Sequence, residues 1–308
     1  YIHVELEGEV KENCDIKVHT TGKVEVTMTK VNENKQWNKI GEPLEDDKKF
    51  ILTTEAGLRY RKCHLASIQP VTHDTNLYAF YLPTASRMHV PVGCHVYLRT
   101  HVSGVEITRP YTVVPPSLDP NQHIDQWKLR SEGKVIYLMI KIYPQGVFTQ
   151  HIVSLKTGDS IEISNWDGDF KTSSGDDCSN LVMFAAGTGF TPIASLLHYC
   201  TQVKKKDNRK ISVILFNKKV KDIPWRTELE KLVETVPDVQ VTNVLSEPDN
   251  DWDGLNGRIR KELIDKFLPS SKNDILICAC GPIEFTKETM RLCKDQGFTN
   301  AHLHAFLV

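Results

Sequence analysis

The last third of the chain alternates between short continuous apolar runs and segments with helical periodicity. The apolar runs are Leu181–Ala186, Ile211–Phe216, Val239–Leu245, Ile275–Cys280 and His302–Val308. The helical patterns between them cover Pro192–Val203, Arg226–Val236, Ile259–Leu268 and Ile283–Asp295. Strands that are apolar on both faces and alternate with helices indicate a parallel sheet covered on both sides. Residues 178–308 are therefore predicted to form a doubly wound α/β domain. If its strands are ordered 3-2-1-4-5, the first and fourth strands are neighbours.

Residues 59–172 show strand signals at a much shorter spacing, with prolines and glycines between them. The predicted strands are Tyr60–Leu65, Tyr78–Leu82, His95–Arg99, Lys134–Tyr143 and Ser160–Ser164. Many short strands separated by turns are typical of a small antiparallel β-barrel.

The first part of the chain has a pattern of apolar and polar residues that differs from both of these regions. In Lys23–Val31 apolar residues occupy every second position, which predicts a half-buried strand. Residues 1–42 look like the tail of an antiparallel β-sandwich, and the polar residues 43–58 are predicted to form a linker. Because so short a sheet segment cannot hold a good core alone, and the sequence starts at Tyr1 rather than Met, we expect a piece of a longer protein.

Composition removes several classes of protein. The 308 residues carry a net charge of −1, so no global field attracts nucleic acid or acidic lipid. No run approaches the ~20 apolar residues of a membrane helix. The eight cysteines lack the paired spacing of a zinc site, and several lie in apolar runs. Buried reduced thiols in an intracellular protein are therefore favoured over a disulfide framework, which remains the alternative.

The clearest candidate site opens the α/β domain. The strand Leu181–Ala186 runs directly into Gly187–Pro192 and then into a helix. Two glycines permit a sharp turn, Thr191 is predicted to cap the helix, and Pro192 suits its first position. The free N–H groups of such a helix start favour a phosphate. Because ligands bind at the switch point of this strand order, Cys280–Pro282 is expected in the same crevice. A glycine-rich turn that serves only compactness is the alternative.

The predicted barrel carries a second constellation. Arg109–Thr112 joins a guanidinium suited to phosphate, a flat phenol and a hydroxyl at the end of a strand. Lys141–Tyr143 then precedes a glycine turn, and a helix is predicted to open at Thr149. Together these residues favour a bound cofactor over a surface arginine beside an ordinary core.

These blocks resemble the cytochrome b5 reductase branch of the ferredoxin-reductase-like flavoproteins over residues 59–308. The blocks are Thr72–Thr75, Pro91–Gly93, Arg109–Thr112, Lys141–Tyr143, Gly146–Thr149, Gly187–Pro192, Arg226–Glu230 and Cys280–Pro282. The resemblance implies that the barrel binds FAD and the α/β domain binds the nicotinamide dinucleotide. It also implies an enzyme that passes electrons from NADH or NADPH through FAD to a haem acceptor, without a general base.

The resemblance also assigns roles to residues, with Thr112 and Cys280 closest to the reacting atoms. Residues implied to contact FAD are Arg109, Pro110, Tyr111, Thr112, Lys141, Tyr143, Gly146, Val147, Phe148 and Thr149. Residues implied to contact the nicotinamide dinucleotide or face the flavin across it are Gly187, Thr188, Gly189, Thr191, Phe216, Lys218, Ser246, Cys280, Gly281 and Pro282. No metal site is assigned. The pair His73 and Asp74 is interpreted as a strand-edge hydrogen bond rather than as part of a catalytic triad.

Three departures from the family pattern affect the expectations. Val113 and Cys94 stand where a proline and a glutamine are usual, both near the flavin by resemblance. Ser246 stands where relatives specific for NADH have an acidic residue, which would repel the additional phosphate of NADPH. With Lys218 and Lys219 as candidate partners of that phosphate, we expect both NADH and NADPH to be used.

Residues 1–42 resemble the end of a CS domain, with Trp37 matching its late tryptophan. In the branch of the family that carries such a segment, a haem-binding cytochrome b5 domain precedes it, so the implied partner is that domain or another haem protein. The resemblance implies an intracellular location on the cytosolic side, in association with the endoplasmic reticulum. The rivals are a nitrate- or ferredoxin-linked reductase module and an adaptor with an idle reductase fold.

Overall fold

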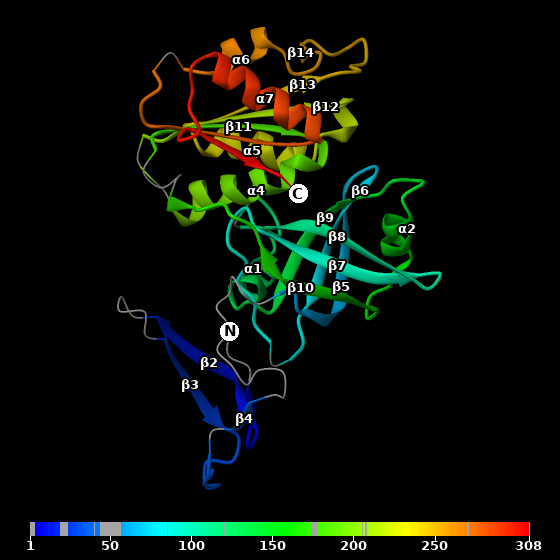
Figure 1. Ribbon diagram of the computed structural model, residues 1–308, viewed down its shortest axis with the longest axis vertical. Coiled ribbons are helices and arrows are strands. Elements are labelled where there is room, and N and C mark those ends of the chain that lie inside the picture. Colours follow the sequence, from blue (N-terminus) through cyan, green and yellow to red (C-terminus); the bar gives the residue numbers. More distant parts are fainter. Residues whose placement is uncertain are drawn as a thin grey trace. The chain divides into compact units, whose positions relative to one another are not determined.

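The computed structural model describes residues 4–18, 24–39, 41–43, 57–84, 86–119, 121–173, 178–204, 206, 208–269 and 271–307. Contacts divide the chain into two compact units, Tyr1–Arg59 and Tyr60–Val308, which are described separately (Figure 1). No helix among the described residues is long and apolar enough to cross a membrane.

The first unit consists of two short antiparallel pairs. Strand β1 (Val4–Leu6) pairs with β4 (Gly41–Pro43), and β2 (Val10–Val18) pairs with β3 (Val24–Lys30). The prediction that β3 is half-buried is wrong, because both Val26 and Met28 on its apolar face are exposed, by 49% and 39%. Among the described residues β3 pairs only with β2. Most of the predicted linker, residues 44–56, lies outside the described residues.

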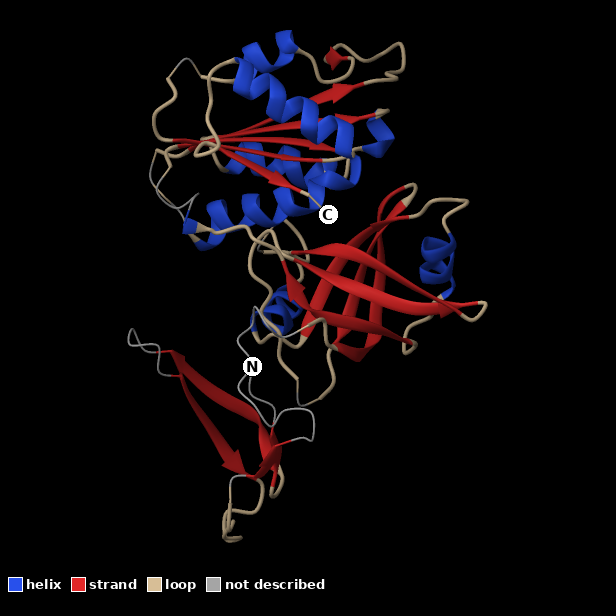
Figure 2. Ribbon diagram, in the orientation of Figure 1, coloured by secondary structure: helices blue, strands red, loops and turns tan. Residues whose placement is uncertain are grey.

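The second unit begins with a closed barrel whose strands follow the order β10-β5-β6-β9-β8-β7. The strands are β5 (Tyr60–Thr72), β6 (Thr75–Tyr81), β7 (His95–Val102), β8 (Val105–Val114), β9 (Val135–Lys141) and β10 (Ser160–Asp167). Two helices, α1 (Ile124–Ser131) and α2 (Val147–Ser154), lie against it (Figure 2). The helix predicted to open at Thr149 thus begins two residues earlier. Its start is displaced because the Thr149 hydroxyl is bonded within the preceding turn, where it accepts the N–H of Tyr143 at 3.1 Å.

The α/β domain has one parallel sheet in the order β14-β13-β12-β11-β15-β16. Its strands are β11 (Asn180–Ala186), β12 (Lys210–Asn217), β13 (Val239–Leu245), β14 (Leu255–Asn256), β15 (Ile275–Cys280) and β16 (Leu303–Phe306). The helices are α4 (Phe190–His198), α5 (Arg226–Thr235), α6 (Lys261–Phe267) and α7 (Ile283–Asp295), with short turns η2 (Gly187–Gly189), η3 (Tyr199–Val203) and η4 (Val220–Asp222). The order 3-2-1-4-5, given above as a condition, is present, with β14 added at one edge.

Alternating side chains of β6 and β9 explain why barrel and α/β domain form one unit. Tyr78 and Phe80 of β6 point into the barrel core, whereas Leu77 and Ala79 belong to a core that also contains α4. Successive side chains of a strand point to opposite faces, so each strand serves both cores at once. The same shared core includes α5, while α6 and α7 pack on the other face of the parallel sheet (Figure 2). The resulting architecture confirms the predicted fold class.

Candidate functional site

A cleft of about 1150 Å³ lies where the barrel strands β8 and β9 face the carboxyl ends of the parallel strands. Its wall contains Pro110, Tyr111, Thr112, Lys141, Tyr143, Thr149, Gly187, Thr188, Gly189, Thr191, Phe216, Lys218, Ser246, Cys280, Gly281 and Pro282. Of the residues predicted to bind a cofactor, Arg109, Gly146, Val147 and Phe148 are not part of this wall. The structure therefore gathers residues from both predicted sites around one space.

The glycine turn after β11 is packed directly against the end of β15. A Cβ at Gly189 would lie 2.2 Å from the carbonyl oxygen of Cys280, so only glycine allows this approach. Gly187 has φ +54°, and no atom lies within 4 Å of where its Cβ would be. Its backbone is thus open to the cleft, while Gly189 holds the two loops together.

The predicted capping role of Thr191 is wrong. The turn η2 takes up Gly187–Gly189, and α4 begins at Phe190 with Gly189 as its N-cap. Thr191 is thus the second residue of the helix and Pro192 the third, so Pro192 does not occupy the first position either. The Thr191 hydroxyl donates to the carbonyl of Thr188 at 3.1 Å. The hydroxyl therefore bonds back into the turn η2 instead of capping the helix.

On β8 the barrel wall presents an aromatic ring and a hydroxyl group, from Tyr111 and Thr112. The ring of Tyr111 stacks with Phe148, with centroids 6.0 Å apart, which places Phe148 behind the wall rather than in it. Burial raises the pKa of Tyr111, so its phenol stays neutral. Thr112 is buried beside it on β8, opposite His95 of β7. Arg109 is exposed and donates to the carbonyl of Thr108 at 2.8 Å.

Lys141 is held at the barrel side of the cleft by an ion pair. Its Nζ lies 2.8 Å from Oδ2 of Asp74. Burial raises the pKa of Asp74, but hydrogen bonds from Lys141 and Thr72 outweigh it and leave that pKa below its usual value. Asp74 is therefore a carboxylate at neutral pH, and it fixes the direction of the lysine.

Cys280 faces the cleft as a neutral thiol. Burial raises its pKa to about 12. A thiolate is the reactive form of cysteine, and at pH 8 such a group is ionised in only ~10⁻⁴ of molecules. Cys280 can therefore border a bound ring as a small neutral side chain, but it cannot serve as a nucleophile.

This leads to a prediction for thiol labelling. Iodoacetamide at pH 8 should modify Cys14, which is exposed, while Cys280 and the other buried cysteines stay unmodified. Peptide mass spectrometry measures the extent at each position, and a sample unfolded in urea gives the full reactivity. Rapid modification of native Cys280 would contradict the assignment of a protonated, enclosed thiol.

At the other end of the cleft, the predicted phosphate partners are engaged in ion pairs. Nζ of Lys218 lies 3.5 Å from Glu247, and Nζ of Lys219 lies 2.7 Å from Asp249. Ser246 itself is fixed by its backbone N–H, which donates to the carbonyl of Asn217 at 2.9 Å. Glu247 thus places a carboxylate one residue later than the position at which the family pattern has it.

Arg258 is a cleft residue that sequence reasoning missed. The N–H of Gly257 donates to the carbonyl of Leu245 at 2.8 Å, so β13 and β14 end side by side and bring Ser246 and Arg258 to the same part of the wall. Other wall residues not predicted are Met139, Ala186, Asn217, Asp222, Glu247, Gly257, Ile259, Ile283, Glu284, Phe285, Glu288 and Phe306. The sequence signal for Phe306 is an aromatic residue at the end of the last apolar run.

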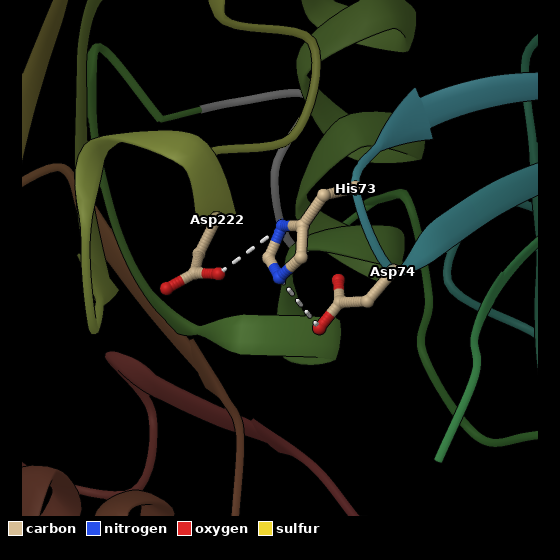
Figure 3. A group of neighbouring side chains, drawn as sticks. All are labelled: His73, Asp74 and Asp222. Carbon is tan, nitrogen blue, oxygen red and sulfur yellow. Dashed lines mark ion pairs between the residues drawn. The ribbon is translucent and has the colours of Figure 1, made fainter. Parts of the chain in front are cut away.

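The pair His73 and Asp74 does make a strand-edge hydrogen bond, since the carbonyl of Asp74 accepts the N–H of Ile142 at 2.7 Å, but the His73 ring has further partners that were not expected. His73 lies in the turn between β5 and β6, and its ring meets Asp222 of the α/β domain, with Asp74 on its other side (Figure 3). The partner Asp222 could not be read from the sequence because it lies 149 positions further along the chain.

Comparison with known proteins decides the family. A family model described as an oxidoreductase FAD-binding domain matches residues 62–172, and one described as an oxidoreductase NAD-binding domain matches residues 183–291. NADH-cytochrome b5 reductase 1 of Dictyostelium discoideum is 31% identical over 248 residues, which cover 80% of this chain and 82% of that protein. The chain belongs to the cytochrome b5 reductase family. It carries one domain of the oxidoreductase FAD-binding type and one of the oxidoreductase NAD-binding type.

Two further members of the cytochrome b5 reductase family match nearly the whole chain. Cytochrome b5 reductase 4 of Homo sapiens is 39% identical over 311 residues, which cover 99% of this chain but only 58% of that protein. The solved structure of the CS-b5R domains of human Ncb5or in its NAD+ form has a TM-score of 0.87 and 38% identity, and the match covers 99% of this chain and 86% of that one. This likeness supports the CS-type assignment of the amino-terminal segment. The chain spans 58% of the length of the reductase 4 relative.

The cleft of this cytochrome b5 reductase family member fits a flavin facing a dinucleotide. Its volume of about 1150 Å³ is large enough for two extended ligands to meet. Tyr111 and Phe306 give aromatic surfaces at the wall, and the bare backbone at Gly187 allows a close approach. Arg109 and the uncapped start of α2 are groups of the kind that bind phosphate, but they lie outside the wall of this cleft.

Proposed function

We propose that this protein takes a hydride equivalent from NADH or NADPH and passes electrons through FAD to a cytochrome b5-type haem domain. One observation carries the proposal: a single cleft has the flavin-type wall of β8 and β9 on one side and the glycine turn and Cys280–Pro282 on the other. The domains are those of FAD- and NAD-binding oxidoreductases. The cofactors supply the redox chemistry, two-electron reduction by the nicotinamide and single-electron release from the flavin.

The residues of the cleft position the two ligands rather than react with them. Tyr111 and Cys280 both stay uncharged because burial raises their pKa values, so neither removes a proton at neutral pH. Gly189 keeps the turn after β11 against Cys280, which fixes the distance between the two sides of the nucleotide crevice. Such fixation is effective because a misplacement of ~1 Å costs a reaction ~100-fold in rate.

The use of NADPH beside NADH is supported by Ser246 and Arg258. Ser246 brings no charge to the wall, and Arg258 makes no hydrogen bond or ion pair within the part of the chain that the structure describes. An arginine fork suits a phosphate monoester. Lys218 also lies at this end of the cleft, but it is paired with Glu247 and would need to leave that pair to contribute.

The first experiment is a visible spectrum of the purified protein, followed by anaerobic addition of NADH and NADPH in separate cuvettes. Flavin bands that bleach with both nucleotides are expected. Bleaching with NADH alone, or NADPH turnover a thousandfold slower, would remove the claim of dual use. A protein that stays colourless after addition of FAD would instead favour the adaptor function.

We also propose an electron acceptor and a cellular location for this protein. Two relatives are named for cytochrome b5 reduction, which supports a b5-type haem domain as the partner, either in the same full-length chain or in another protein. Association with the cytosolic side of the endoplasmic reticulum is proposed from the family alone. Reduction of purified cytochrome b5, followed at its haem absorption band, tests the acceptor directly.

A further inference from the structure

A chain of charged contacts crosses the mouth of the cleft from the barrel to the α/β domain. On the barrel, Lys141 pairs with Asp74, and Oδ2 of Asp74 lies 3.6 Å from Nε2 of His73. On the α/β side, Nδ1 of His73 lies 3.6 Å from Oδ1 of Asp222 and 3.4 Å from the carbonyl of Lys221. Figure 3 shows the imidazole between the two carboxylates.

Both ends of this chain belong to the wall of the cleft. Lys141 lines it from the barrel and Asp222 from the loop that follows β12. Asp222 is itself fixed, because its Oδ2 accepts the backbone N–H of Lys219 at 2.9 Å. Movement of His73 is therefore coupled to both sides of the space that holds the dinucleotide.

The cluster has ligand types that also suit a metal ion, since one imidazole and two carboxylates lie within 4.8 Å of one another. The acceptors of Asp74 are already occupied, however. Its Oδ1 accepts the hydroxyls of Thr72 and Thr75, and its Oδ2 accepts Lys141. The ammonium group of Lys141 beside the cluster disfavours a second cation there.

The protonation state of the imidazole decides how many of these contacts can form. A neutral ring has one N–H and donates to one carboxylate, whereas the imidazolium has two and can serve both. Imidazoles gain their proton between about pH 5 and 8. The charged residues on the two elements that meet here are Asp74 and Lys141 on the barrel, and Lys219, Lys221 and Asp222 on the loop.

We infer that His73 is a positioning residue that, as an imidazolium between Asp74 and Asp222, latches the two domains together at the mouth of the dinucleotide cleft. The inference rests on the proposed function for its consequence, since the latch would tighten nucleotide binding. A latch that forms in the free protein holds residues 218–222 in place before the dinucleotide arrives, so binding has less of this loop to order. We expect an affinity about five-fold tighter from two such partly exposed ion pairs.

The test combines calorimetric titration with NAD+ at pH 6 and pH 8 and hydrogen exchange of the nucleotide-free protein. The wild type should bind NAD+ about five-fold more tightly at pH 6 than at pH 8. His73→Gln and Asp222→Asn should each abolish this dependence, and the double variant should behave like either one. His64→Gln, an exposed barrel histidine that contacts Gly158, serves as the control and should keep the wild-type profile.

Hydrogen exchange separates this inference from the proposed function. Amides of residues 218–222, corrected for intrinsic rates, should be better protected at pH 6 than at pH 8 in the wild type but not in His73→Gln. A wild type that binds no NAD+ at either pH would overturn the proposed function, while exchange would still test the latch. Equal protection at both pH values in the wild type, or an unchanged pH dependence in His73→Gln, would overturn the latch.

Discussion

Replacing Gly189 by alanine should lower the rate of flavin reduction by NADH at least about 100-fold. The new Cβ would lie 2.2 Å from the carbonyl oxygen of Cys280 and 2.5 Å from the backbone nitrogen of Gly281. Those atoms are backbone, so no side chain can rotate away and the two loops must separate. The separation would move the wall against which the nicotinamide is proposed to lie, and strain of this kind costs about 1–3 kcal/mol of unfolding free energy.

Three measurements on the Gly189→Ala variant separate misplacement from general collapse. Flavin content and the thermal unfolding midpoint report the barrel and the fold, and stopped-flow reduction reports the cleft. Gly57→Ala is the matched control, because no atom lies within 4 Å of its Cβ position and its backbone is not left-handed. A variant that keeps wild-type reduction rates would show that the contact between the two loops does not position the nucleotide.

The α/β domain could be predicted closely because its strands carry their own signal. Val239–Leu245 and Ile275–Cys280 coincide with β13 and β15, and Ile283–Asp295 coincides with α7. A strand buried on both faces is a continuous apolar run, so its bounds are visible without knowledge of its neighbours. The position of the glycine turn followed from the same signal, since it comes directly after such a run.

The barrel and the amino-terminal strands were harder for physical reasons. The run from 105 to 114 was not predicted as a whole strand, since it contains Pro110 and charged residues that face solvent on one side. In β3 the apolar alternation was correct as a pattern, but burial depends on a covering layer that the pattern cannot show. Periodicity therefore reports which side of a strand is apolar, not what packs on it.

The candidate site was predictable where its residues follow strand ends and not where they come from distant loops. Gly187 and Cys280 were expected together because neighbouring parallel strands end at one edge. Asp222 and Arg258 have no motif around them and reach the cleft only through the fold of the loops that carry them. These two residues matter for the choice between NADH and NADPH, because both change the charge of the nucleotide site.

Replacing Ser246 by aspartate should lower kcat/KM for NADPH about 100-fold and leave that for NADH within about three-fold, a loss of ~2.7 kcal/mol of binding to the phosphorylated form. Glu247 already places one carboxylate in this wall, where Lys218 partly offsets it. A second carboxylate beside it would face the dianionic phosphate of NADPH, with Arg258 and the already paired Lys218 to compensate. On NADH the same carboxylate would meet a ribose hydroxyl, to which it can bond.

Ser246→Asn is the matched control, because asparagine has the size of aspartate without its charge. If the asparagine variant loses NADPH activity as strongly as the aspartate variant, size rather than charge excludes the phosphate at this position. Arg258→Gln tests the other half of the argument and should weaken NADPH use while leaving NADH use unchanged. If Arg258→Gln weakens the use of both nucleotides equally, Arg258 contacts a part that the two share, such as the pyrophosphate. The use of NADPH would then depend only on the absence of a negative charge at Ser246.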